Sequence, residues 1–146
     1  VLKENPDIRY ILKELPILGP DSIIATRASL AIWRTQQNKY LPFHSALMKA
    51  RGGIPVSKIF NIYNEIGFDI VQIKKDMTDP EIDQILEKNF QLAQALNITG
   101  TPAFIIGNKI IPGAIDEITM KKMIAAVFVC CCDMVLTITN HAGGVY

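Results

Sequence analysis

The chain has 146 residues, of which 49% are hydrophobic and 20% are charged, and its formal net charge is +1. This length supports one domain with a sizeable core, and this balance of residues excludes an intrinsically disordered chain. The charge, without a basic block, gives no indication of nucleic-acid binding or of an electrostatic membrane anchor. The chain opens on Val1 and a polar stretch rather than a signal peptide, which predicts that it was cut from a longer sequence.

A strand followed by a run of helices is predicted in the N-terminal half. Residues 1–5 are typical of the last turn of a helix, and residues 7–15 alternate apolar and polar side chains as a strand does. Asp21 or Ser22 is predicted to cap a helix that runs to about Gln37. Three further helices are expected over residues 41–50, 57–66 and 69–76.

Two more helices are predicted from their caps. Asp79 and Pro80 favour the start of a long helix, because aspartate is a good N-cap and proline suits the first helical position. Asp116 is predicted to cap a last helix. Four apolar residues of that helix are expected to face inward: Met120, Met123, Ile124 and Val127.

A loop and a β-hairpin are predicted between these two helices. Pro102 cannot donate a ladder hydrogen bond, so it is expected at the first residue of a strand. Residues 103–106 are apolar throughout, which is typical of a strand buried on both faces. Gly107 and Asn108 favour a two-residue turn of type II′, in which glycine occupies the first central position.

The three cysteines are consecutive, at positions 130–132, and form neither a Cys-x-x-Cys pair nor a recognisable metal site. They could be small apolar residues, a strained disulfide between neighbours, or metal ligands together with His141. The apolar run 127–139 is too short, and too interrupted by Asp133, to span a membrane. It could form an extra strand, drive association, or be a read-through tail without an evolved role.

Several stretches, taken in order, point to one family. They are residues 14–22 (ELPILGPDS), 28–31 (ASLA), 39–48 (KYLPFHSALM) and 87–113, which includes Gly-Thr-Pro before a buried strand. Together they resemble the DsbA-type thiol:disulfide oxidoreductases, especially the group with 27-kDa outer-membrane-protein-like and BdbD-like members. The resemblance covers about residues 1–126.

This resemblance implies an α/β, thioredoxin-like fold that lacks its first strand and active-site helix and contains an inserted helical domain. Residues 1–20 and 97–128 would form the partial thioredoxin-like domain, residues 21–96 the inserted α-helical domain, and residues 129–146 an atypical hydrophobic, glycine-rich tail. The family's Cys-x-x-Cys helix is expected just upstream of Val1. The sheet edge left unpaired could be filled by a partner's strand or by the chain's own tail, so either a dimer or poor solubility is expected.

In this family a helix N-terminus lowers the pKa of a cysteine thiol, and the thiolate exchanges disulfides with a substrate. The resemblance assigns substrate binding to Thr101 and Pro102, with a cis bond between them that presents the backbone of Thr101 to an extended substrate. It also lets the Thr101 hydroxyl tune the redox potential. The simpler interpretations are a trans proline that starts a strand and a threonine that only shapes a turn.

The leading hypothesis is a fragment of a thiol-disulfide oxidoreductase that acts on cysteines of exported proteins in the periplasm or cell envelope of a bacterium. Alone, it is expected to be inactive, with no catalytic residue, metal or cofactor. Its expected partners are cysteine-containing protein substrates, a redox partner protein and a second copy of itself; no nucleic acid and no transmembrane segment are expected. The alternative is a non-catalytic thioredoxin-like module that binds peptides at the same loop or self-associates.

Four other residues are interpreted as structural. His44 is expected to be a partly exposed packing residue rather than a catalyst. Glu14 could lie near an active site, but an ordinary strand carboxylate is the simpler interpretation. Trp33 and Phe43 are expected in the core or between helices, because large aromatic side chains dominate core packing.

Overall fold

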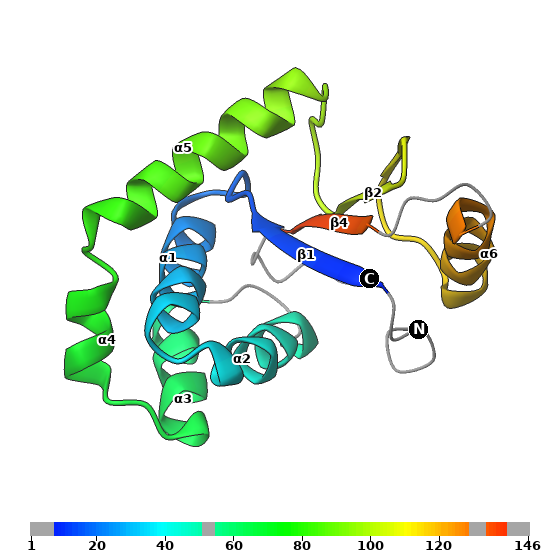
Figure 1. The fold of residues 1–146 in the computed structure, drawn as a ribbon. Coiled ribbons are helices and arrows are strands. Elements are labelled where there is room, and N and C mark those ends of the chain that lie inside the picture. Colours follow the sequence, from blue (N-terminus) through cyan, green and yellow to red (C-terminus); the bar gives the residue numbers. More distant parts are fainter. Residues whose placement is uncertain (1–7, 51–54, 129–133, 140–146) are drawn as a thin grey trace.

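The computed structural model describes residues 8–50, 55–128 and 134–139 of the chain. Figure 1 shows a block of helices on one side and a small sheet with one further helix on the other. The predicted order of a strand, several helices, a hairpin and a last helix is confirmed, and a strand in the tail follows it. The elements are β1 (Arg9–Glu14), α1 (Pro20–Thr35), α2 (Gln37–Lys49), α3 (Val56–Ile66), α4 (Ile70–Asp76), α5 (Pro80–Ala95), β2 (Ala103–Ile106), β3 (Lys109–Pro112), α6 (Glu117–Phe128) and β4 (Met134–Thr139).

The sheet has the strand order β1-β4-β2-β3. The tail strand β4 is parallel to β1 and antiparallel to β2, and β2 is antiparallel to β3. The tail thus forms an extra strand of the chain's own sheet, which was one of the interpretations that the sequence left open. Because β4 lies between β1 and β2, it supplies the ladders that connect the first strand to the hairpin.

The hairpin has the predicted turn. Gly107 has a φ of 59°, and Asn108 is not among the described residues with a positive φ, as type II′ requires. The strand β2 begins at Ala103, one residue after Pro102, and its burial is uneven. Ala103 and Ile106 are buried, whereas the two residues between them are half-buried.

The start of α1 differs from the prediction. Gly19, with a φ of 103°, is the N-cap and gives no side-chain hydrogen bond, so neither Asp21 nor Ser22 caps the helix. Pro20 occupies the first helical position, where its fixed φ suits a helix and its missing N–H is not needed. Asp21 then falls in the first turn, where a carboxylate still interacts favourably with the helix dipole.

The helix α2 begins at Gln37, four residues before the predicted start, so Pro42 lies inside it. An interior proline removes one backbone hydrogen bond, at a cost of about 3 kcal/mol. The turn before Pro42 contains Tyr40, whose side chain is 5% exposed and belongs to the core. Burial of this ring favours the helical turn that the proline disfavours.

Aspartate side chains cap the starts of α4, α5 and α6, and the predictions for Asp79 and Asp116 are confirmed. Asp69 accepts hydrogen bonds from two backbone N–H groups at the start of α4, and Asp79 accepts one at the start of α5. Asp116 accepts one from the Thr119 backbone N–H at 2.8 Å at the start of α6. Gly67 ends α3 in the left-handed conformation, with a φ of 78°.

Two main apolar clusters stabilise these layers. The larger one fills the space between the helices of the block and includes Phe43, Ile59 and Tyr63. The second lies between α6 and the sheet and includes the four predicted inward residues of α6. A small cluster of Leu15 and Ala93, with Phe90 and Ile98 against it, joins the end of β1 to α5. The predicted helical turn at residues 1–5 lies outside the described residues.

Candidate functional site

The loop that precedes β2 is held in place by the end of α5. Asn97 has a left-handed φ of 52°, and its N–H donates to the Gln94 carbonyl at 3.0 Å. The Ile98 N–H donates to the Ala93 carbonyl at 2.8 Å, which completes a Schellman motif. Ile98 also packs against the cluster that contains Ala93. The direction in which the chain leaves α5 is therefore fixed by both hydrogen bonds and apolar contact.

The Thr101–Pro102 peptide bond at the end of this loop is cis, which is the geometry that the resemblance implies. Both residues are half-buried, and Ala103, which follows them, is buried. The Pro102 carbonyl accepts a hydrogen bond of 2.9 Å from the Gly113 N–H, just beyond β3. The loop is thereby attached to the hairpin as well as to α5.

This loop lies at the end of the sheet where β1 and β4 finish. Ala103 pairs with Ile138 of β4, and the next residue of β4, Thr139, pairs with Glu14 of β1. The carboxyl ends of the parallel strands β1 and β4 therefore lie at the same end of the sheet as Pro102, which precedes β2. Ligands of open α/β sheets commonly bind beyond the carboxyl ends of the strands.

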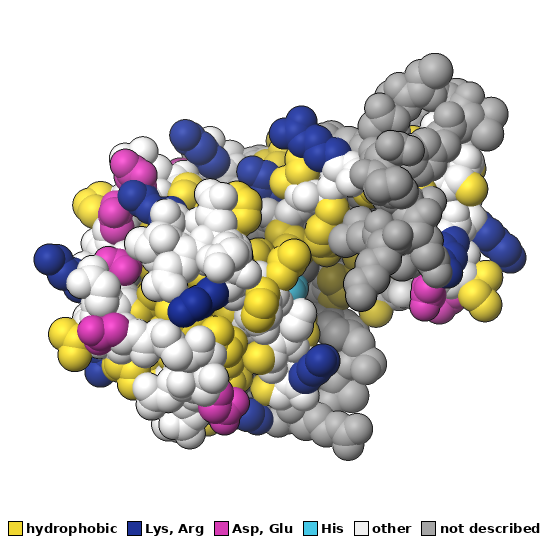
Figure 2. Space-filling model, turned by 60° about the horizontal axis from the view of Figure 1, so that its bottom comes forward, with side chains coloured by type: hydrophobic (Ala, Val, Ile, Leu, Met, Phe, Trp, Pro, Cys, Tyr) yellow, Lys and Arg dark blue, Asp and Glu magenta, His cyan; other side chains and the backbone are white. Residues whose placement is uncertain are grey.

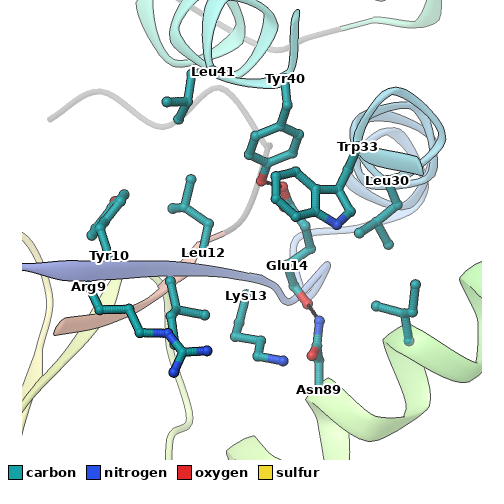
Figure 3. Close-up of a pocket in the computed structure, with 12 residues that line it drawn as sticks. Arg9, Tyr10, Leu12, Lys13, Glu14, Leu30, Trp33, Tyr40, Leu41 and Asn89 are labelled. Carbon is teal, nitrogen blue, oxygen red and sulfur yellow. Dashed lines mark hydrogen bonds between the residues drawn. The ribbon is translucent and has the colours of Figure 1, made fainter. Parts of the chain in front are cut away.

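A buried carboxyl lies at the same end of β1. Glu14 is 1% exposed, and the Tyr40 hydroxyl donates to its Oε1 at 2.7 Å (Figure 3). The Asn89 side-chain amide donates to the Glu14 backbone carbonyl at 2.8 Å. Burial, followed by the neighbouring Glu14 carboxyl, raises the pKa of the Tyr40 hydroxyl far above the ordinary tyrosine range. Tyr40 therefore remains a hydrogen-bond donor at any physiological pH.

A cavity of about 540 Å³ lies along β1, between this strand and three helices. All six residues of β1 line it. Its walls are formed by Leu30 and Trp33 of α1, Tyr40 and Leu41 of α2, and Ile85 and Asn89 of α5 (Figure 3). A space of this size can hold the side chains of a short peptide or a small ligand.

The residues interpreted as structural behave differently from one another. Phe43 is fully buried and stacks on Tyr63 with ring centroids 4.6 Å apart, as predicted. His44 stacks on Tyr40 at 5.8 Å, which agrees with a packing role. Trp33 is not a core residue, because its side chain is 46% exposed beside the cavity, but its ring contacts that of Tyr40 edge-on at 5.5 Å, so it packs between α1 and α2 as the other interpretation predicts. The interpretation of Glu14 as an ordinary strand carboxylate is wrong, because this carboxyl is buried and hydrogen-bonded.

The cysteines at positions 130–132 and His141 lie outside the described residues, so the three interpretations of these cysteines stay predictions. Among residues 8–50, 55–128 and 134–139, no cluster of three or more histidine, cysteine, aspartate or glutamate side chains suits a metal ion. In the same part of the chain, no helix has the length and apolar character needed to cross a membrane.

Sequence reasoning did not identify the Glu14–Tyr40 pair or the cavity. One signal was present, because strand alternation places Glu14 on the same face as Tyr10 and Leu12. A carboxyl in line with two apolar residues indicates a buried polar group that needs a partner. The identity of that partner depends on how α2 packs against β1, and local periodicity does not encode this contact.

Comparison with known proteins relates most of the chain to one family. Residues 2–125 match the family model of the DSBA-like thioredoxin domain. The chain is 28% identical over 117 residues to a probable disulfide bond formation protein D of Bacillus anthracis, with 75% of this chain and 52% of that protein covered. It is 24% identical over 120 residues to a Na⁺/H⁺ antiporter NhaA of Herminiimonas arsenicoxydans, with 82% of this chain and 19% of that protein covered. The chain therefore spans about half of one curated relative and about a fifth of the other.

Solved structures agree with this relationship. A thioredoxin-like oxidoreductase from Silicibacter pomeroyi DSS-3 is 33% identical with a TM-score of 0.81, over 88% of this chain and 73% of that one. A periplasmic thioredoxin-like protein from Salmonella enterica serovar Typhimurium is 30% identical with a TM-score of 0.78, over 87% and 70%. The catalytic domain of Proteus mirabilis ScsC is 27% identical with a TM-score of 0.77, over 87% and 69%.

Proposed function

Because this chain belongs to the DSBA-like thioredoxin domain family, we propose that it is part of a thiol-disulfide oxidoreductase that acts on cysteines of exported proteins. The Thr101–Pro102 loop is its substrate-docking element. The observation that supports this most is the position of the loop, beyond the carboxyl ends of β1 and β4 and attached to both α5 and the hairpin. A loop fixed in this way can hold an extended segment of substrate in one orientation.

The reaction of such an enzyme needs a thiolate that attacks a substrate disulfide and forms a mixed disulfide with it. A second thiol of the enzyme then attacks the mixed disulfide and releases the reduced substrate, while the enzyme pair becomes oxidised. This sequence has no Cys-x-x-Cys pair that could perform both steps. We therefore assign docking to Thr101 and Pro102, place the reacting pair in sequence upstream of Val1, and expect the chain alone to be inactive.

The test of this assignment is a reductase assay, in which the chain is given dithiothreitol and insulin and the turbidity of the reduced insulin B chain is followed. We expect the background rate, both for the chain and for the triple variant C130S/C131S/C132S. Turnover above background in the triple variant would contradict the expected inactivity of the chain, and it could not come from a thiol of the chain, because the variant has no cysteine. Turnover that the triple variant abolishes would place the chemistry on the consecutive cysteines instead.

The second candidate is a non-catalytic peptide-binding or self-associating module, and the absence of a Cys-x-x-Cys pair from the sequence favours it. The reading frame on both sides of the chain separates the candidates. A Cys-x-x-Cys shortly before Val1 supports the oxidoreductase, whereas a complete domain without one supports the module. Light scattering tests self-association, since a monomer at high protein concentration argues against a homodimer.

We also propose that the parent protein acts in the periplasm or cell envelope. A similar solved structure, from Salmonella enterica serovar Typhimurium, is described as periplasmic. Disulfide chemistry on exported proteins requires an oxidising compartment of this kind. Fractionation of cells that express the parent gene is the direct measurement, and recovery from the cytosolic fraction alone would contradict the proposal.

A further inference from the structure

The strand β1 lies at an edge of the sheet. Its ladder partner β4 lies on one side, and no strand in the described part of the chain pairs with the other side. An edge strand presents a row of backbone N–H and C=O groups that another chain can use as a template. At the end of the row, the Glu14 carbonyl already accepts from Asn89. The edge that can accept a new strand therefore extends over residues 9–13.

This edge faces the cavity rather than the bulk of a neighbouring helix. Six successive residues of β1 line the cavity. Because successive side chains of a strand point to opposite faces, the cavity contacts side chains of both faces and the backbone between them. The cavity is thus a cleft that follows the strand. Its volume of about 540 Å³ suits the side chains of a short extended segment.

One wall of the cleft is apolar and open to solvent. Trp33 is 46% exposed and Leu41 is 54% exposed, although both are large hydrophobic side chains. Figure 2 shows hydrophobic side chains exposed over the middle of the face drawn there, with both basic and acidic side chains around them. Exposed apolar side chains that line a cleft are typical of a surface that another molecule covers.

The opposite side of the cleft is basic. Side chains alternate along β1, and Figure 3 shows Leu12 on the side of Tyr40, whereas Arg9 and Lys13 extend the other way. Arg9 is exposed and Lys13 is half-buried. Neither forms an ion pair with a residue in the described part of the chain. Two cations four residues apart on one face of a strand complement two carboxylates with the same spacing.

We propose that this cleft binds an extended, acidic segment of another polypeptide, which adds to the sheet as a strand beside β1. Its carboxylates, at positions i and i+4, face Arg9 and Lys13. Its apolar side chains, at i+1 and i+3, lie against Trp33 and Leu41. Backbone hydrogen bonds supply affinity and the alternating side chains supply specificity, as in other strand additions. This surface is separate from the Thr101–Pro102 loop, because β4 lies between β1 and β2.

A second copy of the chain is a poorer occupant. If two β1 strands paired antiparallel with their faces matched, Arg9 of one protomer would lie opposite Lys13 of the other. Like charges directly opposite one another in a sheet are destabilising. The basic side of the cleft thus favours an acidic partner over self-pairing.

The chain has a built-in reporter for the test, because Trp33 is its only tryptophan and lies at the cleft. The probe is the peptide acetyl-Thr-Glu-Val-Thr-Val-Glu-Thr-amide, titrated into the full chain. We expect a saturable blue shift of tryptophan emission and slower amide hydrogen exchange within residues 9–13. A matched peptide with both glutamates replaced by lysine should bind about tenfold more weakly, because two surface ion pairs are lost.

Charge reversal separates binding from misfolding. The variant R9E/K13E should prefer the lysine peptide, a gain that an unfolded protein cannot show. The control K109E, on the far edge strand β3, and T101A, on the docking loop, should bind the glutamate peptide as the parent chain does. Equal binding of both peptides, no slowing of exchange in residues 9–13, or loss of binding in T101A would each overturn the proposal. None of these results bears on the proposed disulfide chemistry.

Discussion

The two buried tyrosines of the helical block offer a matched test of what hydrogen bonding contributes to this fold. The Tyr40 hydroxyl donates to Glu14 Oε1 at 2.7 Å, and both side chains are buried. The Tyr63 ring is fully buried, but its hydroxyl has no hydrogen-bond partner among the described residues. Tyr→Phe removes only the hydroxyl in each case, so the difference between the variants isolates the value of the bond.

Y40F should lower the free energy of unfolding by about 1–3 kcal/mol, because a buried carboxyl oxygen loses its donor. Y63F should change it by less than about 0.5 kcal/mol, or raise it, since an unpartnered hydroxyl is removed from an apolar site. Urea denaturation followed by circular dichroism measures both values under the same conditions. Equal effects of the two substitutions, or a larger loss in Y63F, would refute this reasoning.

Three further predictions concern pH and backbone conformation. Burial raises the pKa of both Tyr40 and Tyr63. The contribution of the two protonated tyrosines to the free energy of unfolding is therefore fully present below the ordinary tyrosine pKa and is lost as pH rises above it. Spectrophotometric titration should show at least two tyrosines that ionise only on unfolding. Hydrogen bonds to its carboxylate lower the pKa of Asp116, so its capping contribution is present at neutral pH and lost in acid; D116A should therefore unfold more easily than the parent chain at pH 7 but not below the Asp116 pKa, as thermal melts can show. G107A should cost about 1–2 kcal/mol, because φ is 59° and a new Cβ would lie 3.0 Å from a methyl group of Val127; denaturant unfolding measures this loss.

Much of the fold could be predicted because its signals are local. Asp79 and Asp116 each combine a capping side chain with the start of an apolar helical pattern, and each helix begins where that combination predicts. Gly107 determines the hairpin turn because few other residues adopt its φ. These are interactions between residues a few positions apart, which a sequence displays directly.

The features that could not be predicted depend on contacts between distant elements. Proline is favoured in the first turn of a helix, which places the predicted start next to Pro42, whereas the burial of Tyr40 favours the earlier start of α2. Trp33 has the size of a core residue and contacts Tyr40 of α2, yet its side chain is 46% exposed beside the cleft. The partner of β4 was likewise left open, since an apolar strand does not specify which edge it will pair with.

The sheet order explains why the two proposed surfaces must be tested by substitution rather than by deletion. The docking loop begins a strand that pairs with β4 at Ile138, and the cleft follows a strand that pairs with β4 on its other side, as far as Thr139. Removal of residues 129–146 would unpair both neighbours at once, so loss of binding at either surface would follow from the loss of the sheet. Substitutions at Thr101 and at Arg9 change one side chain on the docking loop and one on β1 while β4 stays in place. Independent effects of those two substitutions therefore distinguish two sites from one damaged sheet.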